Sequence, residues 1–355
     1  MNCKISAWRR PWSAQNLTLE DYPELAASRA FSVAKLAELA ELAQPLCALA
    51  GLESLVVAGS LGRLEAMPDS DCDLMVIVGD DVAQGSAQAC EILEAVWLSI
   101  APAGLKRPKN WGIFTQAASG RALTDPAALG ALDDDPNLFG KRMQLLLDSQ
   151  AFFGEQAFCQ LKLRLIRWFM TAAVARDREF PFAHLLGELA RYYRSYVAWQ
   201  QFKLTVEDDE NWCVRQAKLA SSRRLMVATA KLAILKAACR AEPLARQVGL
   251  LAELLTHPPL ERLAHAAPER CAEDVGEVFA RAEAFQAILG HRSGRAALLA
   301  QSPVTLYQLE NPAAYSSAVF NELAAQGRAL GDALTRVLLQ ALADAPPACA
   351  RTLLV

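Results

Sequence analysis

The stretch LVVAGSLGRLEAMPDSDCDLMVIV, residues 55–78, decides how this chain of 355 residues folds. It contains two short apolar runs, LVVA at 55–58 and LMVIV at 74–78, bounded by Gly, Ser, Pro and Asp. Such runs are typical of buried β-strands. A Gly-Ser turn ends the first run, and a helix is expected to begin around residues 61–63. The stretch therefore predicts a strand, a tight turn, a short helix and a second strand.

The turn between the two strands has residues suited to binding an anion. Gly59 and Gly62 lack a Cβ atom, so a ligand can approach the backbone closely. Amide groups at the start of a helix can hold phosphate oxygens, while Ser60 adds a hydroxyl donor and Arg63 a fixed cation. We therefore expect these four residues to bind phosphate groups.

The second strand opens with two carboxylates. Asp71 and Asp73 lie two positions apart, which places both on one face of a strand, whereas Cys72 points to the other face. Carboxylates about 5–7 Å apart repel each other unless a divalent cation lies between them. The spacing predicts a metal site formed by Asp71 and Asp73.

Together these features resemble the signature of the DNA polymerase β-like nucleotidyltransferase superfamily, in which a Gly-Ser turn is followed by Asp-x-Asp at the start of a strand. The longer pattern is similar to the branch that contains the uridylyltransferase of the nitrogen-signalling protein and the glutamine synthetase adenylyltransferase. The matching residues are Gly59, Ser60, Gly62, Arg63, Glu65, Ser70, Asp71, Asp73 and Leu74. Glu65 also suits the start of a helix for electrostatic reasons alone.

Outside this stretch the chain is mostly helical in pattern. Apolar residues recur at steps of three and four over 32–50, and residues 87–99 return to the same spacing. WGIFT at 111–115 predicts a third strand, and from residue 138 onward almost all of the sequence reads as helix. The predicted fold class is α+β, with a small mixed-sheet nucleotidyltransferase domain followed by a large all-helical region.

The predicted organisation has four parts: an N-terminal helical segment (1–50), a nucleotidyltransferase catalytic domain (51–136), a helical nucleotide- or substrate-binding domain (137–255) and a C-terminal helical region (256–355). Charge divides along similar lines. Residues 51–140 contain five Lys and Arg against thirteen Asp and Glu, whereas residues 141–240 contain seventeen against nine. This asymmetry suits a metal-bound polyphosphate held between the two units, although complementarity between two domains would produce it as well.

A second group of candidate residues lies in WCVRQAKLASSRRLM, residues 212–226. Arg215, Lys218 and Ser222 are spaced at three and four, which places them on one helix face, with Arg223 close beside them. Such a face could hold a triphosphate, and we assign these four residues to nucleotide binding. A solvated face with ion pairs is the alternative.

Two further segments, 132–154 and 191–196, resemble segments of poorly characterised bacterial nucleotidyltransferases. In the first, an Arg-Met-x-Leu-Leu-Leu-Glu-Ser helix precedes a turn in those proteins. In the second, Tyr192 or Tyr193 is the expected source of an aromatic ring for stacking on the nucleotide base. The resemblance covers roughly residues 50–230.

The chain departs from the superfamily pattern in its third carboxylate, which commonly lies on a later strand and often deprotonates the acceptor. The predicted strand within 111–117 contains no Asp or Glu. The nearest acids are Asp125 and the run from Asp133 to Asp135, so Asp133 and Asp135 are candidate catalytic residues. They would also suit a cap of the helix that follows, and the third carboxylate could be missing altogether.

Composition limits the class of protein. Hydrophobic residues make up 53% and charged residues 21%, which excludes a mainly disordered chain, and a net charge of −3 argues against coating of nucleic acid. The first 15 residues lack the apolar segment of a signal peptide, and the apolar runs are too short for a membrane span. Nine scattered cysteines without a CxxC motif suggest thiols in a reducing compartment. We expect a cytoplasmic protein without a membrane partner.

The predicted function is Mg²⁺-dependent transfer of a nucleoside monophosphate from a nucleoside triphosphate to a hydroxyl group, with release of pyrophosphate. Asp71 and Asp73 would hold two Mg²⁺ ions, with Mn²⁺ as a possible substitute. A protein or a small molecule is the expected acceptor, and nucleic acid is less favoured because no binding module for it is visible. The alternatives are a non-catalytic nucleotide-binding regulatory protein with a degenerate site, and a toxin or defence enzyme that modifies tRNA ends.

Overall fold

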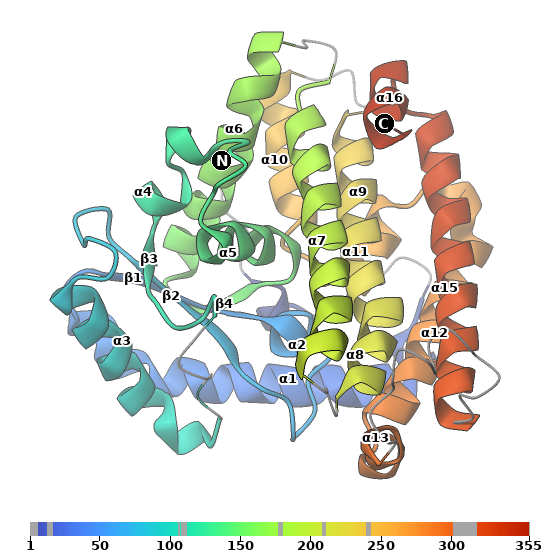
Figure 1. Ribbon diagram of the computed structural model, residues 1–355, viewed down its shortest axis with the longest axis horizontal. Coiled ribbons are helices and arrows are strands. Elements are labelled where there is room, and N and C mark those ends of the chain that lie inside the picture. Colours follow the sequence, from blue (N-terminus) through green and yellow to red (C-terminus); the bar gives the residue numbers. More distant parts are fainter. Residues whose placement is uncertain are drawn as a thin grey trace.

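The computed structural model of the protein describes residues 6–12, 17–105, 107, 112–176, 180–207, 211–238, 243–300 and 318–354. A small sheet and its flanking helices lie beside a larger group of helices (Figure 1). The predicted α+β class is confirmed. None of the described helices combines the length and the hydropathy that crossing a membrane requires.

The sheet has four strands: β1 (Leu52–Ala58), β2 (Asp73–Val78), β3 (Ala118–Ser119) and β4 (Gln150–Phe153), in the order β3-β2-β1-β4. β1 is antiparallel to β2 and β4, whereas β3 is parallel to β2. Ala58 pairs with Asp73, so the end of β1 and the start of β2 lie at the same edge of the sheet. The two strands predicted at 55–58 and 74–78 are confirmed.

The third predicted strand is wrong. Residues 112–117 form turns and bends because Gly112 has φ +110°, and Trp111 lies outside the described residues. The third strand is instead the short β3 that follows. β4 was not predicted, because four residues within a helical context have too little alternation to signal a strand. It lies beyond the predicted domain boundary at 136, so the sheet includes a strand from the 137–255 part.

The longer helices that pack around the sheet are α1 (Pro23–Leu42), α3 (Ala87–Ile100), α5 (Pro136–Leu147) and α6 (Glu155–Arg176). The other helices are α2 (Gly59–Gly62), α4 (Gly120–Leu123), α7 (Ala183–Glu207), α8 (Trp212–Lys218), a π-helical turn (Leu219–Arg223), α9 (Arg224–Ala238), α10 (Leu244–Leu254), α11 (Pro259–Ala266), α12 (Ala272–Leu289), α13 (Arg292–Leu299), α15 (Ala318–Ala343) and α16 (Pro347–Leu354). Short 3₁₀ turns occupy Ala7–Arg9, Leu19–Asp21, Gln44–Ala48, Ala101–Ala103, Pro126–Ala128 and Glu269–Cys271.

Alternation along β1 and β2 places apolar side chains on both faces of the sheet, as expected for strands covered on both sides. One face joins the large core formed by α5–α7, α9–α12 and α15, through Val56, Ala58, Met75 and Ile77. The other face packs with α1 and α3, through Leu55, Val57, Leu74, Val76 and Val78. The sheet and the helical region therefore share one continuous core.

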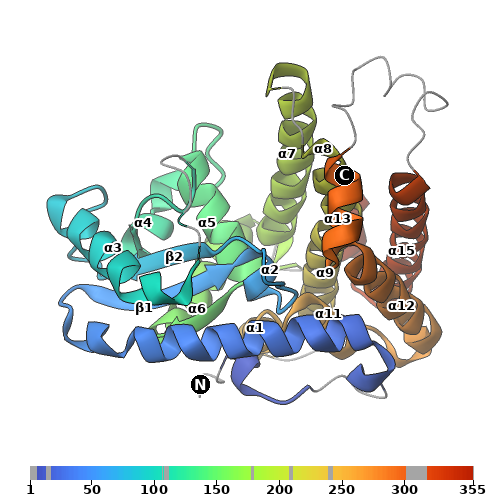
Figure 2. The same cartoon turned by 90° about the horizontal axis from the view of Figure 1, so that it is seen from below.

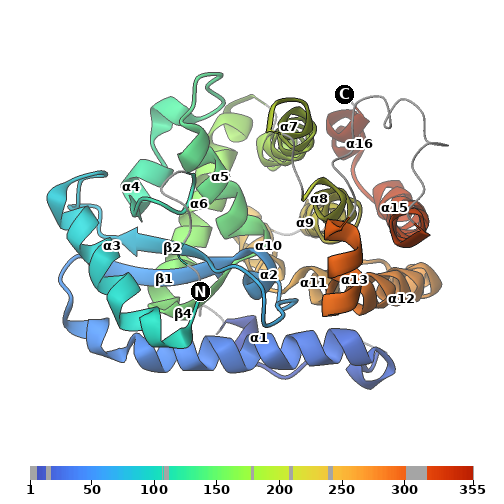
Figure 3. The ribbon, with the colours of Figure 1, turned by 60° about the horizontal axis from the view of Figure 1, so that its bottom comes forward.

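Helix α1 runs beneath both the sheet and the helical region (Figure 2). At its N-terminal end the amides of Glu24 and Leu25 each donate to the carboxylate of Glu283 on α12, both at 2.9 Å. At its C-terminal end the carbonyl of Leu42 accepts from the hydroxyl of Ser99 on α3, at 2.6 Å. The helix is therefore held by hydrogen bonds to both parts of the molecule. Figure 3 shows the course of α1 along both parts from a second side.

The cysteines at positions 47, 72, 90, 213, 271 and 349 form no disulfide bond, whereas Cys159 is disulfide-bonded. The expectation that the cysteines are thiols is therefore wrong at Cys159.

Two fully buried cations hold helix ends together in the large core. Arg262 donates to the carbonyls of Leu147, which ends α5, and of His257, at 2.5 and 2.9 Å. Lys162 donates to the carbonyl of Leu255 after α10, at 3.0 Å. A cation at a helix C-terminus satisfies carbonyls that have no partner within the helix. Burial and the neighbouring Arg262 lower the pKa of Lys162 from 10.5 to about 7.

This lowered pKa predicts how stability depends on pH. Below pH 7 the Lys162 amine is charged in both states, so its burial penalty is fully present. Between about pH 7 and 10.5 the unfolded chain binds a proton that the folded chain has released, so the free energy of unfolding rises with pH. Lys162→Met should reduce this rise, as measured by urea unfolding across the range. An unchanged slope would show that the amine is not desolvated.

Candidate functional site

The turn after β1 is shaped by two glycines that leave room for protein atoms. Gly59 has φ +67°, and a Cβ atom built on it would lie 2.1 Å from Oδ2 of Asp73. A Cβ atom on Gly62 would lie 2.0 Å from the carbonyl oxygen of Asp148. The close approach expected at both glycines exists, but Asp73 and the Asp148 backbone use it rather than a phosphate. Because α2 has only four residues, its dipole adds little to anion binding.

The two predicted metal ligands lie at this edge of the sheet. Asp73 is the first residue of β2 and partly buried, while Asp71 lies in the preceding loop and is exposed. Among the described residues neither carboxylate has a hydrogen-bond or ion-pair partner. Burial and the charges of Asp148 and Asp71 raise the pKa of Asp73 to about 6, against the lowering effect of Arg223 and Arg63. These carboxylates are therefore available to a cation.

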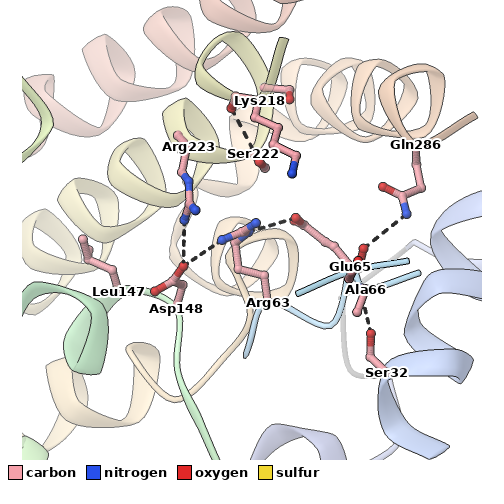
Figure 4. Close-up of polar contacts among 12 residues, drawn as sticks. Ser32, Arg63, Glu65, Ala66, Leu147, Asp148, Lys218, Ser222, Arg223 and Gln286 are labelled. Atoms are coloured by element: carbon pink, nitrogen blue, oxygen red, sulfur yellow. Dashed lines mark hydrogen bonds and ion pairs between the residues drawn. The ribbon is translucent and has the colours of Figure 1, made fainter. Parts of the chain in front are cut away.

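A buried ion-pair network around Asp148, drawn in Figure 4, lies near enough to Asp73 to act on its charge. Oδ2 of Asp148 accepts from Arg63 at 2.7 Å and from Arg223 at 3.2 Å, and the Asp148 side chain is 0% exposed. Arg63 also donates to Glu65 at 2.9 Å. Arg63 thus lines the cavity, but its guanidinium is engaged by two carboxylates, so it orders the turn rather than serving as an uncommitted cation.

The sequence prediction did not include Asp148. It follows the last residue of α5 as a lone acid after three leucines, the position of the Glu in the Arg-Met-x-Leu-Leu-Leu-Glu-Ser pattern. That resemblance was the available signal. Only the folded structure shows that Asp148 reaches both the turn after β1 and the helical region.

The structure places the residues of the predicted cationic face at a cavity. Arg215, Lys218, Ser222 and Arg223 all line it. The turn Leu219–Arg223 is π-helical, a form that is frequent at functional sites. The hydroxyl of Ser222 donates to the carbonyl of Lys218 at 3.5 Å, a contact that competes with the regular helical pattern.

The opposite wall contains Ser60, Glu65, Asp71 and Asp73, and the cavity between the walls has a volume of about 310 Å³. Arg295 on α13 adds a cation that sequence reasoning missed, because nothing local distinguishes it from other exposed arginines. Carboxylates therefore face cations across the cavity.

Lys218 lies among several of these cations. It lines the cavity and is exposed to solvent. The removal of water and the charges of Arg295, Arg223 and Arg63 lower the pKa of Lys218 to about 8, against the opposing effect of Asp71. A cluster of cations that lowers the pKa of the lysine among them suits a site for a polyanion.

Several predicted residues lie elsewhere. Asp135 caps α5 by accepting from the amide of Asn137 at 2.7 Å, and Asp133 is exposed. Since α5 is 12 residues long, its N-terminus lies about 18 Å from Asp148 at its other end. The structure thus does not bring Asp133 and Asp135 to the carboxylates of β2, because α5 holds them at its far end.

The stacking ring predicted at Tyr192 or Tyr193 is also misplaced. Tyr192 is buried in the core, and the hydroxyl of Tyr193 lies 3.5 Å from the carbonyl of Leu219. The tyrosine that lines the cavity is Tyr196, whose ring centroid is 5.6 Å from the guanidinium carbon of Arg223. One helical turn separates the predicted residue from the observed one.

A second cavity of about 240 Å³ adjoins the first and shares Met67, Ser70 and Asp71 with it. Its other walls come from α1 and from the turn at Ala101–Ala103. Its one lysine, Lys35, donates to the carboxylate of Glu38 at 2.6 Å and to the carbonyl of Ala103 at 3.1 Å. The exposed carboxylate of Asp71 thus lies between the two cavities.

Within the described ranges, no group of three or more His, Cys, Asp and Glu side chains is arranged to hold a metal ion. Comparison of the chain with protein-family models, with curated proteins and with solved structures yields no match. The chemistry of the site therefore has to be argued from its own residues.

The close packing around Gly62 predicts that a larger residue there destabilises the fold. Gly62→Ala should lower the free energy of unfolding by more than about 2 kcal/mol, because the new Cβ meets two carbonyl oxygens, those of Asp148 and Val57. Gly187→Ala, within α7 and with open space around it, should instead stabilise by about 0.5–1 kcal/mol. Urea unfolding measures both, and equal effects would contradict the close approach.

The ion-pair network predicts that removing the charge of Asp148 destabilises the fold. Asp148→Asn leaves Arg63 and Arg223 buried without their shared carboxylate, so unfolding free energy should fall by about 3–5 kcal/mol. Asp344→Asn removes a surface pair with Arg270 and should cost about 0–1 kcal/mol. Similar losses in both variants would show that Asp148 is not the electrostatic centre of the core.

Proposed function

We propose that the protein is a nucleotidyltransferase that binds a nucleoside triphosphate in the larger cavity. The observation that carries this proposal is the pairing of two carboxylates without partners, Asp71 and Asp73, with cations on the facing wall. A metal-bound triphosphate has complementary groups for both walls. The resemblance of residues 55–78 to the DNA polymerase β-like superfamily supports the same reaction.

The donor set fits Mg²⁺. Mg²⁺ is usually held by one or two carboxylates together with substrate phosphates, rather than by a cage of protein ligands. Asp71 and Asp73 would supply the carboxylates, and Mn²⁺ accepts the same oxygen donors. Bound there, the divalent cation would offset the charge of the phosphates and polarise the reacting phosphoryl group.

Lys218 and Arg295 line the cavity and have no ion-pair partner among the described residues, so these two would contact the β- and γ-phosphates. Ser60 and Ser222 would donate hydroxyl groups. Arg223 would contribute less to phosphate binding, because it already forms an ion pair with Asp148. The charge clamp is therefore centred on Lys218 rather than spread evenly over the helix face.

In the proposed reaction, the acceptor oxygen forms a bond to the α-phosphorus as the bond from that atom to pyrophosphate breaks. Such displacements place the attacking and leaving oxygens roughly in line. With pyrophosphate held by Lys218 and Arg295, the acceptor would approach from the second cavity, past Asp71. The acceptor's proton would pass to Glu65, the third carboxylate that lines the cavity, with a change in its ion pair with Arg63.

The second cavity bears on the acceptor. Its lysine is already engaged by Glu38, and its other charged residues are Asp69 and Asp71. Carboxylates repel the phosphates of a nucleic acid. This favours a small molecule or a protein side chain over the end of a tRNA.

A non-catalytic nucleotide sensor is the second candidate. The absence of a three-carboxylate group among the described residues favours it, because the base and metal ligands of a transferase would then be incomplete. Asp71 and Asp73 would serve such a sensor only to bind the nucleotide.

The decisive test is transfer of label from each α-labelled triphosphate, with Mg²⁺ and cell extract, into protein, RNA or small molecules. The variant with Asp71→Asn and Asp73→Asn should lose transfer by at least about a hundredfold. The matched variant with Asp133→Asn and Asp135→Asn should keep it, because Asn caps a helix as well as Asp does. Binding of triphosphate without transfer would favour the sensor, and transfer by the Asp71/Asp73 variant would reject the proposed site.

A further inference from the structure

Gln200 lies on the cavity wall with an unmet hydrogen-bonding requirement. It is on α7, which packs beside α8 and α9 (Figure 1), and it is only 5% exposed. Its Oε1 atom is buried and has no hydrogen-bond partner among the described residues. A buried amide oxygen without a partner destabilises the fold, so packing alone does not explain why a glutamine occupies this position.

The missing partner has to be a donor. Oε1 of an amide accepts hydrogen bonds and cannot donate them. The phosphates of the proposed substrate are acceptors as well, so they cannot satisfy the Oε1 atom of Gln200. The part of the ligand that meets Gln200 therefore carries an N–H or O–H group.

Tyr196 lies beside Gln200 in the lining of the cavity. It lies one helical turn before Gln200, on the same face of α7, and both residues line the cavity. An aromatic ring and an amide side by side are the usual means of holding a base, the ring by stacking and the amide by its hydrogen-bonding edge.

Building on the proposed function, we propose that Gln200 reads the base of the triphosphate and selects adenine. Oε1 would accept from the exocyclic amine, and the Nε2 amide would donate to the adjacent ring nitrogen. A glutamine amide pairs with adenine in this bidentate way because one edge of that base presents a donor next to an acceptor.

The test compares the affinity of ATP with that of purine riboside 5′-triphosphate, which lacks only the amine, by calorimetry with Mg²⁺. The wild-type protein should prefer ATP by about tenfold or more, the effect of leaving one buried hydrogen bond unmade. Gln200→Leu should reduce this preference to within about twofold. Gln88→Leu, an exposed glutamine on α3, should leave it unchanged.

Gln200→Glu provides a sharper variant. A carboxylate accepts hydrogen bonds at both oxygens. The variant protein should therefore lose its preference for ATP and gain affinity for GTP, whose base presents two adjacent N–H groups. The melting temperature of Gln200→Leu should not fall, because the substitution removes a polar atom without a partner. A clear fall in the melting temperature would show that Gln200 stabilises the fold, which would contradict a role in base recognition alone.

The outcomes separate the two proposals. Equal wild-type affinity for ATP and purine riboside triphosphate would overturn base reading while leaving the transferase proposal intact. A Gln200-dependent loss with 2′-deoxy-ATP instead would show that the donor is the ribose hydroxyl, and would also overturn it. Failure of the wild-type protein to bind any triphosphate would overturn both.

Discussion

The buried carboxylate of Asp148 holds this structure together at the point where its parts meet. It accepts from Arg63, in the turn after β1, and from Arg223, at the end of the π-helical turn. The fold therefore brings two of the positively charged residues of the site to one fully buried anion. Glu65, which pairs with Arg63, balances the second of these cations.

This arrangement divides the charged residues into two groups with different roles. Arg63, Glu65 and Asp148 satisfy one another and fix the shape of the turn. Lys218 and Arg295 have no such pair among the described contacts and face the carboxylates of β2 across the cavity. A ligand that carries both a metal ion and phosphates would pair with Asp71, Asp73, Lys218 and Arg295. It would leave the ion pairs among Arg63, Glu65 and Asp148 intact.

The extent to which the sequence predicts this site follows from how local each signal is. β1 and β2 depend on spacing within short segments, and these two predictions are confirmed; the residues around Lys218 also follow from local spacing and line the cavity. Arg295 and Tyr196 reach the cavity, and Asp148 reaches the ion-pair network beside it, through tertiary packing, which no local spacing reveals. The predicted strand at 111–115 failed for a related reason, since a glycine with positive φ outweighed the apolar residues around it.

Helix α1 has a consequence for how the cavity works. The carboxylate of Glu283 on α12 accepts from the N-terminal amides of α1, and the hydroxyl of Ser99 on α3 donates to the C-terminal carbonyl of α1. Between these ends, the hydroxyl of Ser32 accepts from the amide of Ala66, next to Glu65, as Figure 4 shows. A hinge motion that separated the sheet from the helices would have to break these bonds at both ends of one rigid rod. We therefore expect the cavity to keep its width, so that a ligand would enter and leave by diffusion through its mouth rather than by opening and closing of two lobes.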